Sequence, residues 1–177
     1  MSRAEIIIFS AITSFLIWIS WNVSLKEKRF HGFTRFFAFE SIVLLFILNY
    51  RYWFVNPLSF QQLFSWAFLT GSAIFAIVGF VLLTKLGHPE GNIENTSHLI
   101  TTGIYRYIRH PLYLSLLLLG FGIMLKHPVL STWILAIINM TSVFFTARIE
   151  EKEMIMKFGE AYREYMKKSK MFIPLIF

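Results

Sequence analysis

The residues best suited to chemistry lie in one polar segment, from Ser97 to Tyr113, between two long apolar stretches. Its centre reads Arg109-His110-Pro111-Leu112-Tyr113, which places a cation, an imidazole, a helix-starting proline and a phenol together. Basic groups at a helix N-terminus can bind a carboxylate or a phosphate. Tyr105 and Tyr113 could form an aromatic wall for a cation. Anchoring of the chain at a membrane interface is the alternative explanation of the same residues.

A second candidate is the carboxylate pair Glu150-Glu151, which follows a later apolar stretch. Carboxylates near membrane depth are costly unless they are paired or functional. They could instead be acidic residues at the start of a cytoplasmic helix, where they stabilise the helix dipole. The chain has no cysteine, and its five histidines lack metal-ligand spacing, so we predict no metal site. It also lacks a serine nucleophile elbow and the glycine-rich loops that bind phosphates or dinucleotides.

The composition indicates an integral membrane protein. Of the 177 residues, 56% are hydrophobic and 18% are aromatic, and the mean hydropathy is +0.59. A soluble domain of this length could not bury so much apolar surface. A net charge of +7 can indicate nucleic-acid binding, but here basic residues flank apolar spans, where they set orientation and contact anionic headgroups. We therefore expect membrane lipids, and no nucleic acid, as partners.

Hydropathy and turn signals predict an all-α, polytopic membrane protein with about five transmembrane helices. The spans are expected over residues 4–25, 36–55, 60–86, 112–125 and 129–149. Lys126-His127-Pro128 joins the last two spans as a helical hairpin. We treat residues 1–177 as a single membrane domain with three spans in 1–86. Residues 87–177 then supply a polar loop over 87–103, the hairpin and an amphipathic surface helix over 150–170.

The basic residues predict the orientation in the membrane. When alternate loops are assigned to opposite sides, all 17 lysines and arginines except Arg3, Arg51 and Lys126 fall on one side. Short loops that are rich in lysine and arginine face the cytoplasm, so we expect the N-terminus outside. Residues 109–111 and Glu150-Glu151 then share the cytoplasmic side. The hairpin brings the start of one helix near the end of the other, so both groups could form one site.

These residues resemble the integral-membrane methyltransferases of the isoprenylcysteine carboxyl methyltransferase family, which are related to phospholipid N-methyltransferases. The family pattern is Leu-Val-x-x-Gly-x-Tyr, then His-Pro-x-Tyr, a hairpin, Glu-Glu, Phe-Gly-x-x-Tyr-x-x-Tyr and a proline. The chain carries Leu99-Ile100, Gly103-Ile104-Tyr105, Arg109-His110-Pro111-Leu112-Tyr113, Glu150-Glu151, Phe158-Gly159-Glu160-Ala161-Tyr162-Arg163-Glu164-Tyr165 and Pro174 in this order.

The resemblance implies an enzyme that uses S-adenosylmethionine to methylate a lipophilic small molecule or a lipidated acceptor, with carboxyl O-methylation of the isoprenylcysteine type expected first. It implies catalytic roles for Arg109, His110 and Glu150. The implied cofactor-binding residues are Ser97, His98, Leu99, Ile100, Tyr105, His110, Pro111, Leu112, Tyr113, Glu150 and Glu151. The chain looks like the compact prokaryotic members, so we expect a multi-pass protein of a prokaryotic cell membrane whose active site faces the cytoplasm.

Two positions depart from the family pattern. Where the family usually has histidine, this chain has Ser97, and His98 lies next to it. Where the carboxyl methyltransferases have a substrate-contacting arginine, four residues before the first glutamate, this chain has Thr146. The nearest arginine is Arg148, which is our expected substrate residue.

Three other functions stay open at this stage. They are phospholipid N-methyltransferase-like activity, a sterol-reductase-like oxidoreductase that uses a nicotinamide cofactor, and a non-enzymatic membrane scaffold or transporter. The intact His-Pro-x-Tyr motif and glutamate pair favour the methyltransferase over the reductase. A transporter would be expected to carry polar residues at mid-span on facing helices, and these spans carry few.

Overall fold

The computed structural model describes residues 2–27, 29–88 and 96–174, so residues 89–95 of the predicted polar loop lie outside it. The described residues form helices and no strands, in agreement with the predicted all-α class. The α-helices are α1 (Arg3–Val23), α2 (His31–Asn49), α3 (Phe60–Leu86), α4 (Pro111–Met124), α5 (Leu130–Phe158) and α6 (Glu160–Lys168). The short 3-10 helices are η1 (Leu25–Glu27), η2 (Tyr50–Tyr52) and η3 (Gly103–Arg106).

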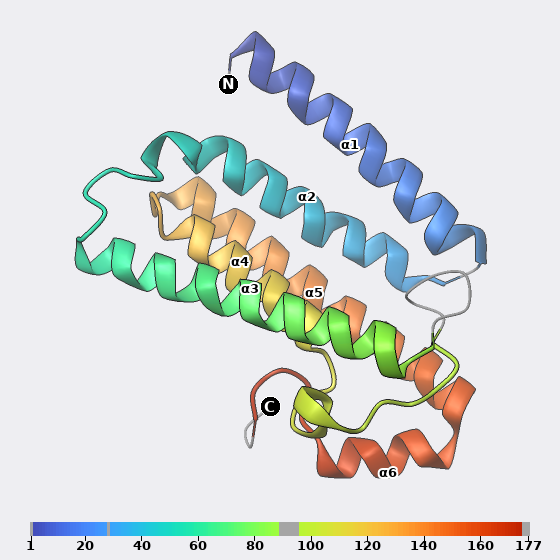
Figure 1. The fold of residues 1–177 in the computed structure, drawn as a ribbon. Helices are drawn as coiled ribbons and strands as arrows, with labels where there is room; N and C mark the ends of the chain where they lie inside the picture. The colour runs from blue at the N-terminus through green and yellow to red at the C-terminus, as the bar shows by residue number, and fades with distance from the viewer. Residues whose placement is uncertain (1, 28, 89–95, 175–177) are drawn as a thin grey trace.

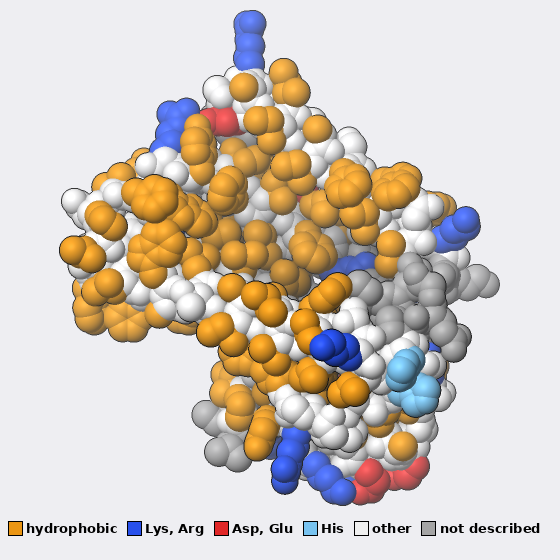
Figure 2. All heavy atoms as spheres, in the orientation of Figure 1, with side chains coloured by type: hydrophobic (Ala, Val, Ile, Leu, Met, Phe, Trp, Pro, Cys, Tyr) orange, Lys and Arg blue, Asp and Glu red, His pale blue; other side chains and the backbone are white. Residues whose placement is uncertain are grey.

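Helices α2, α3, α4 and α5 pack into one bundle, whereas α1 lies along α2 and α6 crosses one end of the bundle (Figure 1). In the part of the chain that the structure describes, four segments are long and apolar enough to cross a membrane: Arg3–Val23, His31–Tyr52, Phe60–Leu86 and Leu130–Phe158. α4 is apolar but shorter. Hydrophobic side chains cover most of the bundle on the face in Figure 2, and charged side chains gather beyond it. This distribution fits a bilayer around the helices.

Polar side chains hold the bundle together by bonding backbone carbonyls of neighbouring helices. Ser72 and Ser65 of α3 donate to the carbonyls of Ser115 and Gly122 on α4, at 2.8 Å and 2.6 Å. Asn139 of α5 donates to the Ala38 carbonyl of α2 at 3.0 Å. Side-chain hydrogen bonds of this kind are favoured between helices in lipid, where water does not compete. They fix the positions of α2, α3 and α5 around α4.

Two predicted boundaries are wrong. α2 begins at His31 instead of near residue 36, because the His31 ring is fully buried and contacts Glu153 of α5 at 2.9 Å. The amphipathic helix predicted over 150–170 is two elements: α5 continues through Glu150 to Phe158, and α6 follows. Gly159, with a φ of 59°, makes the turn between them, a conformation that residues with a Cβ rarely adopt. Glu150 therefore belongs to the same helix as the apolar residues of α5.

The α4–α5 contact generates a prediction for Gly120. A Cβ at this position would lie 2.6 Å from the Asn139 Oδ1 atom, so Gly120→Ala must displace Asn139 and its bond to α2. We expect the free energy of unfolding to fall by about 1–3 kcal/mol, measured as a lower midpoint temperature of thermal unfolding in detergent. Gly71→Ala is the matched control, because its Cβ would meet Leu118 at 3.4 Å, an ordinary contact. Equal melting of both variants would contradict the packing described here.

Candidate functional site

The loop before α4 is fixed by two buried tyrosines. The Tyr105 hydroxyl, in η3, donates to the Gly79 carbonyl of α3 at 3.2 Å. The Tyr165 hydroxyl, in α6, donates to the Tyr105 carbonyl at 2.6 Å. Burial raises the pKa of Tyr165 to about 12, and burial together with the Glu150 charge raises the pKa of Tyr105 above its ordinary value. Both phenols therefore stay protonated and act as hydrogen-bond donors.

The C-terminal segment pairs with the residues just before α4. Ile108 and Lys170 form a parallel bridge. The Arg109 amide donates to the Lys170 carbonyl at 2.8 Å, and the His110 amide donates to the Met171 carbonyl at 3.2 Å. This backbone pairing continues up to Pro111, the first residue of α4. Proline suits this position because the first amide of a helix has no partner within the helix. The tail thus sets the position from which the His110 ring and the first turn of α4 extend.

The Arg109 side chain joins the loop, the tail and α5. Its Nε donates to Glu151 Oε1 at 2.7 Å, and its Nη1 donates to the carbonyls of Met166 and Ser169. The His110 Nε2 lies 3.5 Å from the same Glu151 oxygen. Only 9% of the Arg109 side chain and 3% of the Glu151 side chain are exposed. A buried charge needs such partners, so this pair commits Arg109 to holding the structure together.

The two adjacent glutamates face different surroundings. Consecutive helix residues point about 100° apart, so Glu150 and Glu151 cannot face the same way. Glu151 points to Arg109, whereas Glu150 lines a cavity next to α4. Among the described residues Glu150 makes no ion pair. Its carboxylate therefore contributes a negative charge to the cavity wall.

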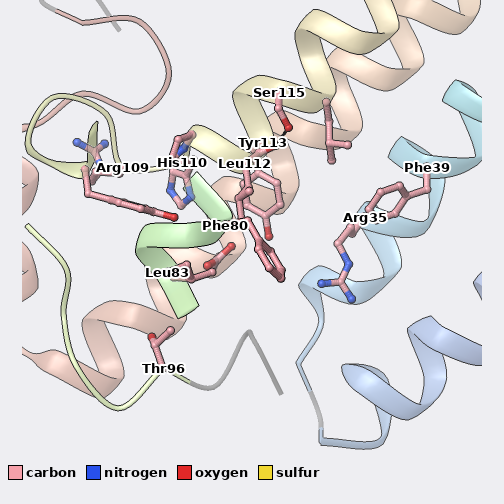
Figure 3. A pocket seen from close by; sticks show the side chains of 14 residues that line it. Arg35, Phe39, Phe80, Leu83, Thr96, Arg109, His110, Leu112, Tyr113 and Ser115 are labelled. Carbon is pink, nitrogen blue, oxygen red and sulfur yellow. Dashed lines mark hydrogen bonds between the residues drawn. The ribbon is translucent and has the colours of Figure 1, made fainter. Parts of the chain in front are cut away.

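The cavity lies where α2, α3, α4, α5 and the loop before α4 meet, and it has a volume of about 360 Å³ (Figure 3). This volume is within the range of small-molecule sites in proteins. Its lining is mostly apolar, with charged groups from α2, the loop and α5. The lining residues are Arg35, Phe39, Phe80, Leu83, Thr96, Tyr105, Arg109, His110, Pro111, Leu112, Tyr113, Ser115, Leu116 and Glu150.

A smaller cavity of about 60 Å³ adjoins the first, since six lining residues are common to both, Glu150 and His110 among them. His98, Ile100 and Met154 add to its wall, together with Tyr162 and Tyr165 of α6. The combined space runs from the α6 side, outside the bundle, to the apolar helices. Such a site could admit a polar molecule from one end and an apolar molecule from the other.

The structure brings most of the predicted site residues together. Arg109, His110, Pro111, Leu112 and Tyr113 line the larger cavity with Tyr105 and Glu150, and His98 and Ile100 line the smaller one.

Four predicted residues lie outside both linings. Ser97 donates to the His88 carbonyl, Leu99 packs against the Met154 and Tyr165 cluster, Glu151 binds Arg109, and Arg148 is 55% exposed. Their predicted roles stay predictions.

Seven residues that line the larger cavity were not predicted: Arg35, Phe39, Phe80, Leu83, Thr96, Ser115 and Leu116. The apolar ones come from the faces of α2, α3 and α4, and nothing distinguishes them in sequence from residues that face lipid. Arg35 was counted among the basic residues that set orientation. The sequence signal for Arg35 was its position close to the predicted start of a span. The orientation of the chain in the membrane was already enough to explain a basic residue there.

Comparison with known proteins gives a consistent result. Residues 60–161 match the family model described as phospholipid methyltransferase. The chain is 37% identical over 96 residues to a protein-S-isoprenylcysteine O-methyltransferase of Schizosaccharomyces pombe. This alignment covers 52% of this chain and 40% of the relative. It is 31% identical over 78 residues to a methanethiol S-methyltransferase of Crocosphaera subtropica. This alignment covers 43% of this chain and 29% of that relative. The chain thus spans less than half the length of these relatives. No solved structure matches it significantly.

The Arg109–Glu151 contact generates a prediction. Glu151→Gln leaves the Arg109 charge buried without its counterion, so we expect a stability loss of about 3 kcal/mol in thermal unfolding. Limited proteolysis should also cut the C-terminal segment sooner, because Arg109 bonds its carbonyls. Glu160→Gln serves as the control, since Glu160 and Arg163 form an exposed pair at 3.9 Å, and such pairs contribute little. If the two variants unfold at the same temperature and are cleaved at the same rate, the buried Arg109–Glu151 pair does not stabilise the loop and the C-terminal segment.

Proposed function

The chain belongs to the phospholipid methyltransferase family, and we propose that it is a membrane enzyme that transfers a methyl group from S-adenosylmethionine to a lipophilic acceptor. The observation that carries this proposal is the Glu150 carboxylate, which lines a cavity with aromatic walls and makes no ion pair among the described residues. Carboxylates and aromatic rings are the groups that hold cations, and this donor carries a sulfonium.

The residues around the cavity fit this donor. Glu150 would hold one of its positively charged groups, and Tyr105 and Tyr113 would border the sulfonium. The first turn of α4 would face its carboxylate, since the amide groups of Leu112 and Tyr113 at this helix N-terminus favour an anion. When bound, S-adenosylmethionine supplies an electrophilic methyl group, whose bond to sulfur breaks as the acceptor atom takes it.

We propose carboxyl O-methylation as the reaction, in keeping with relatives named as isoprenylcysteine O-methyltransferases. An acceptor carboxylate is already ionised, so no residue has to remove a proton. His110 then serves to bind and orient, Arg109 holds the loop before α4 in place, and the apolar helices exclude water. Positioning two reactants in a dry site can account for a large part of a rate enhancement.

The arrangement also suggests how the two substrates arrive. The polar end of the cavity lies beside α6, which carries charge, and the apolar end lies among α2, α3 and α4. The water-soluble donor would enter from the cytoplasm, on the side to which the basic residues assign this end, while a lipophilic or lipidated acceptor enters from the bilayer. The N-terminus would then lie outside the cell.

The Glu150 carboxylate provides the test. We expect wild-type protein in detergent to bind S-adenosylmethionine by calorimetry, and Glu150→Gln to bind it about 10- to 100-fold more weakly, the usual cost of losing a charged hydrogen bond. Glu164→Gln, in an exposed pair with Lys167, should bind like wild type. Absence of binding by the wild type would reject the proposed function. Equal binding by Glu150→Gln would reject only the assignment of the site.

A further inference from the structure

A groove on the outside of the bundle lies between α6 and the loop that carries η3. It has a volume of about 890 Å³. One wall comes from residues 101–107, and the other comes from residues 161, 164, 165 and 168, which form one face of α6. None of its charged residues lines either of the two cavities described above. This α6 groove is therefore separate from the proposed methyl-transfer site.

Two cations border the α6 groove, one from each wall. Arg106 lies in η3 and Lys168 in the last turn of α6, and both side chains are exposed. Neither forms an ion pair among the described residues. The carboxylate of the described lining, Glu164, is paired with Lys167. Two like charges repel each other, and an anion between them removes this repulsion. The groove thus favours an anion that Arg106 and Lys168 can share.

The α6 groove lies at the depth of the membrane surface. α3 has 27 residues, so it is about 40 Å long and exceeds a hydrocarbon core of about 30 Å. η3 packs on the end of α3, because a Cβ at Gly103 would lie 2.7 Å from Leu82. Leu82 comes only about 6 Å, or one turn, before the last residue of α3. This distance places the η3 wall in the headgroup layer, at the end of the molecule where charged side chains gather (Figure 2).

Tyr107 adds an aromatic ring next to the cations. Its side chain is 57% exposed, and the guanidinium carbon of Arg106 lies 6.0 Å from the centre of the ring. Exposed tyrosines are typical of the membrane interface, because the ring contacts lipid while the hydroxyl stays in water. A ring beside a cation fits a phospholipid, whose phosphate binds the cation and whose glycerol and upper chains contact the ring. An inorganic anion would not use the ring.

Tyr165 connects the α6 groove to the interior of the protein. It lines both the groove and the smaller cavity. Its hydroxyl donates to the Tyr105 carbonyl at 2.6 Å, which joins α6 to η3. An anion shared by Arg106 and Lys168 would join the same two elements from outside. It would therefore stabilise the contact between α6 and η3 that shapes the cavity wall.

We propose that the α6 groove binds the phosphate headgroup of an anionic membrane phospholipid, with Arg106 and Lys168 as its ligands. Such a lipid supplies the negative charge that the groove lacks, at the depth where the groove lies. Phosphatidylcholine carries its own ammonium group and has no net charge, so it should bind more weakly. The bound lipid is not the methyl acceptor. The inference therefore does not depend on the proposed function.

Lipid binding can be measured by native mass spectrometry. The full chain is released from mixed detergent micelles that contain phosphatidylglycerol and phosphatidylcholine in varied amounts. We expect wild type to retain phosphatidylglycerol selectively, and Arg106→Gln/Lys168→Gln to bind it on the order of 10- to 30-fold more weakly, because two cations at the surface are lost. Lys152→Gln/Arg163→Gln is the matched control, since it removes the same charge from exposed positions outside the groove. It should bind phosphatidylglycerol like wild type.

Thermal unfolding in detergent is the second measurement, because a ligand that binds the folded state raises the midpoint temperature. Phosphatidylglycerol should raise the midpoint of wild type and of the control, but not that of Arg106→Gln/Lys168→Gln. Equal midpoints of all three proteins in phosphatidylcholine show that the loss of binding does not come from misfolding. If the variant does unfold earlier, Arg106→Lys, which keeps the charge, should still retain the lipid.

Three results would overturn the inference. One is retention of phosphatidylglycerol by Arg106→Gln/Lys168→Gln at the level of wild type. Another is an equal loss in the control variant, which would show a general attraction of the basic surface for anionic lipid. The third is an equal rise of the midpoint with inorganic phosphate in phosphatidylcholine micelles, which would show a site for free phosphate. A wild type that does not bind S-adenosylmethionine would reject the proposed function and leave these results unchanged.

Discussion

The buried ion pair between Arg109 and Glu151 is the interaction on which the site depends. It joins α5 to the residues before α4, and the same guanidinium bonds two carbonyls near the C-terminus. Charges this deeply buried destabilise a protein unless both are satisfied, so the pair strongly favours one arrangement of loop, tail and helix. Because Glu151 points to Arg109, the rotation of α5 is set and Glu150 points into the cavity. The ion pair is structural, and its consequence is that the neighbouring carboxylate, Glu150, faces the cavity.

The membrane explains why the remaining polar contacts are arranged as they are. In lipid, serine and asparagine side chains that bond backbone carbonyls can fix helices without a hydrophobic driving force between them. Ser65, Ser72 and Asn139 do this for the bundle, and the Thr34–Thr146 contact does so near the site. At the far end Lys126 is buried over the Trp66 ring at 3.4 Å and donates to Gln62 at 3.0 Å. With both ends held, the cavity can form between helices that are otherwise apolar.

The sequence was sufficient to predict the helices and the polar segment that precedes α4, but not how neighbouring residues divide their positions. Long apolar runs with proline and glycine turns leave few alternatives to membrane helices. The separation of Glu150 from Glu151 depends on the rotation of α5, and the position of Arg35 depends on the register of α2 against α5. Both are set by contacts between residues far apart in sequence, such as His31 with Glu153. The pairing of residues 108–110 with the tail runs through backbone atoms, so no pattern of side chains records it.

The central claim is that one site is built from the loop before α4 and from the Glu150 turn of α5. Hydrogen–deuterium exchange of the full chain in detergent, with and without S-adenosylhomocysteine, tests this claim directly. We predict slower exchange on binding in peptides from residues 96–113 and in peptides around Glu150, at the same ligand concentration, with α1 unaffected. Protection of only one of the two segments, or protection confined to α1, would contradict a site shared between them.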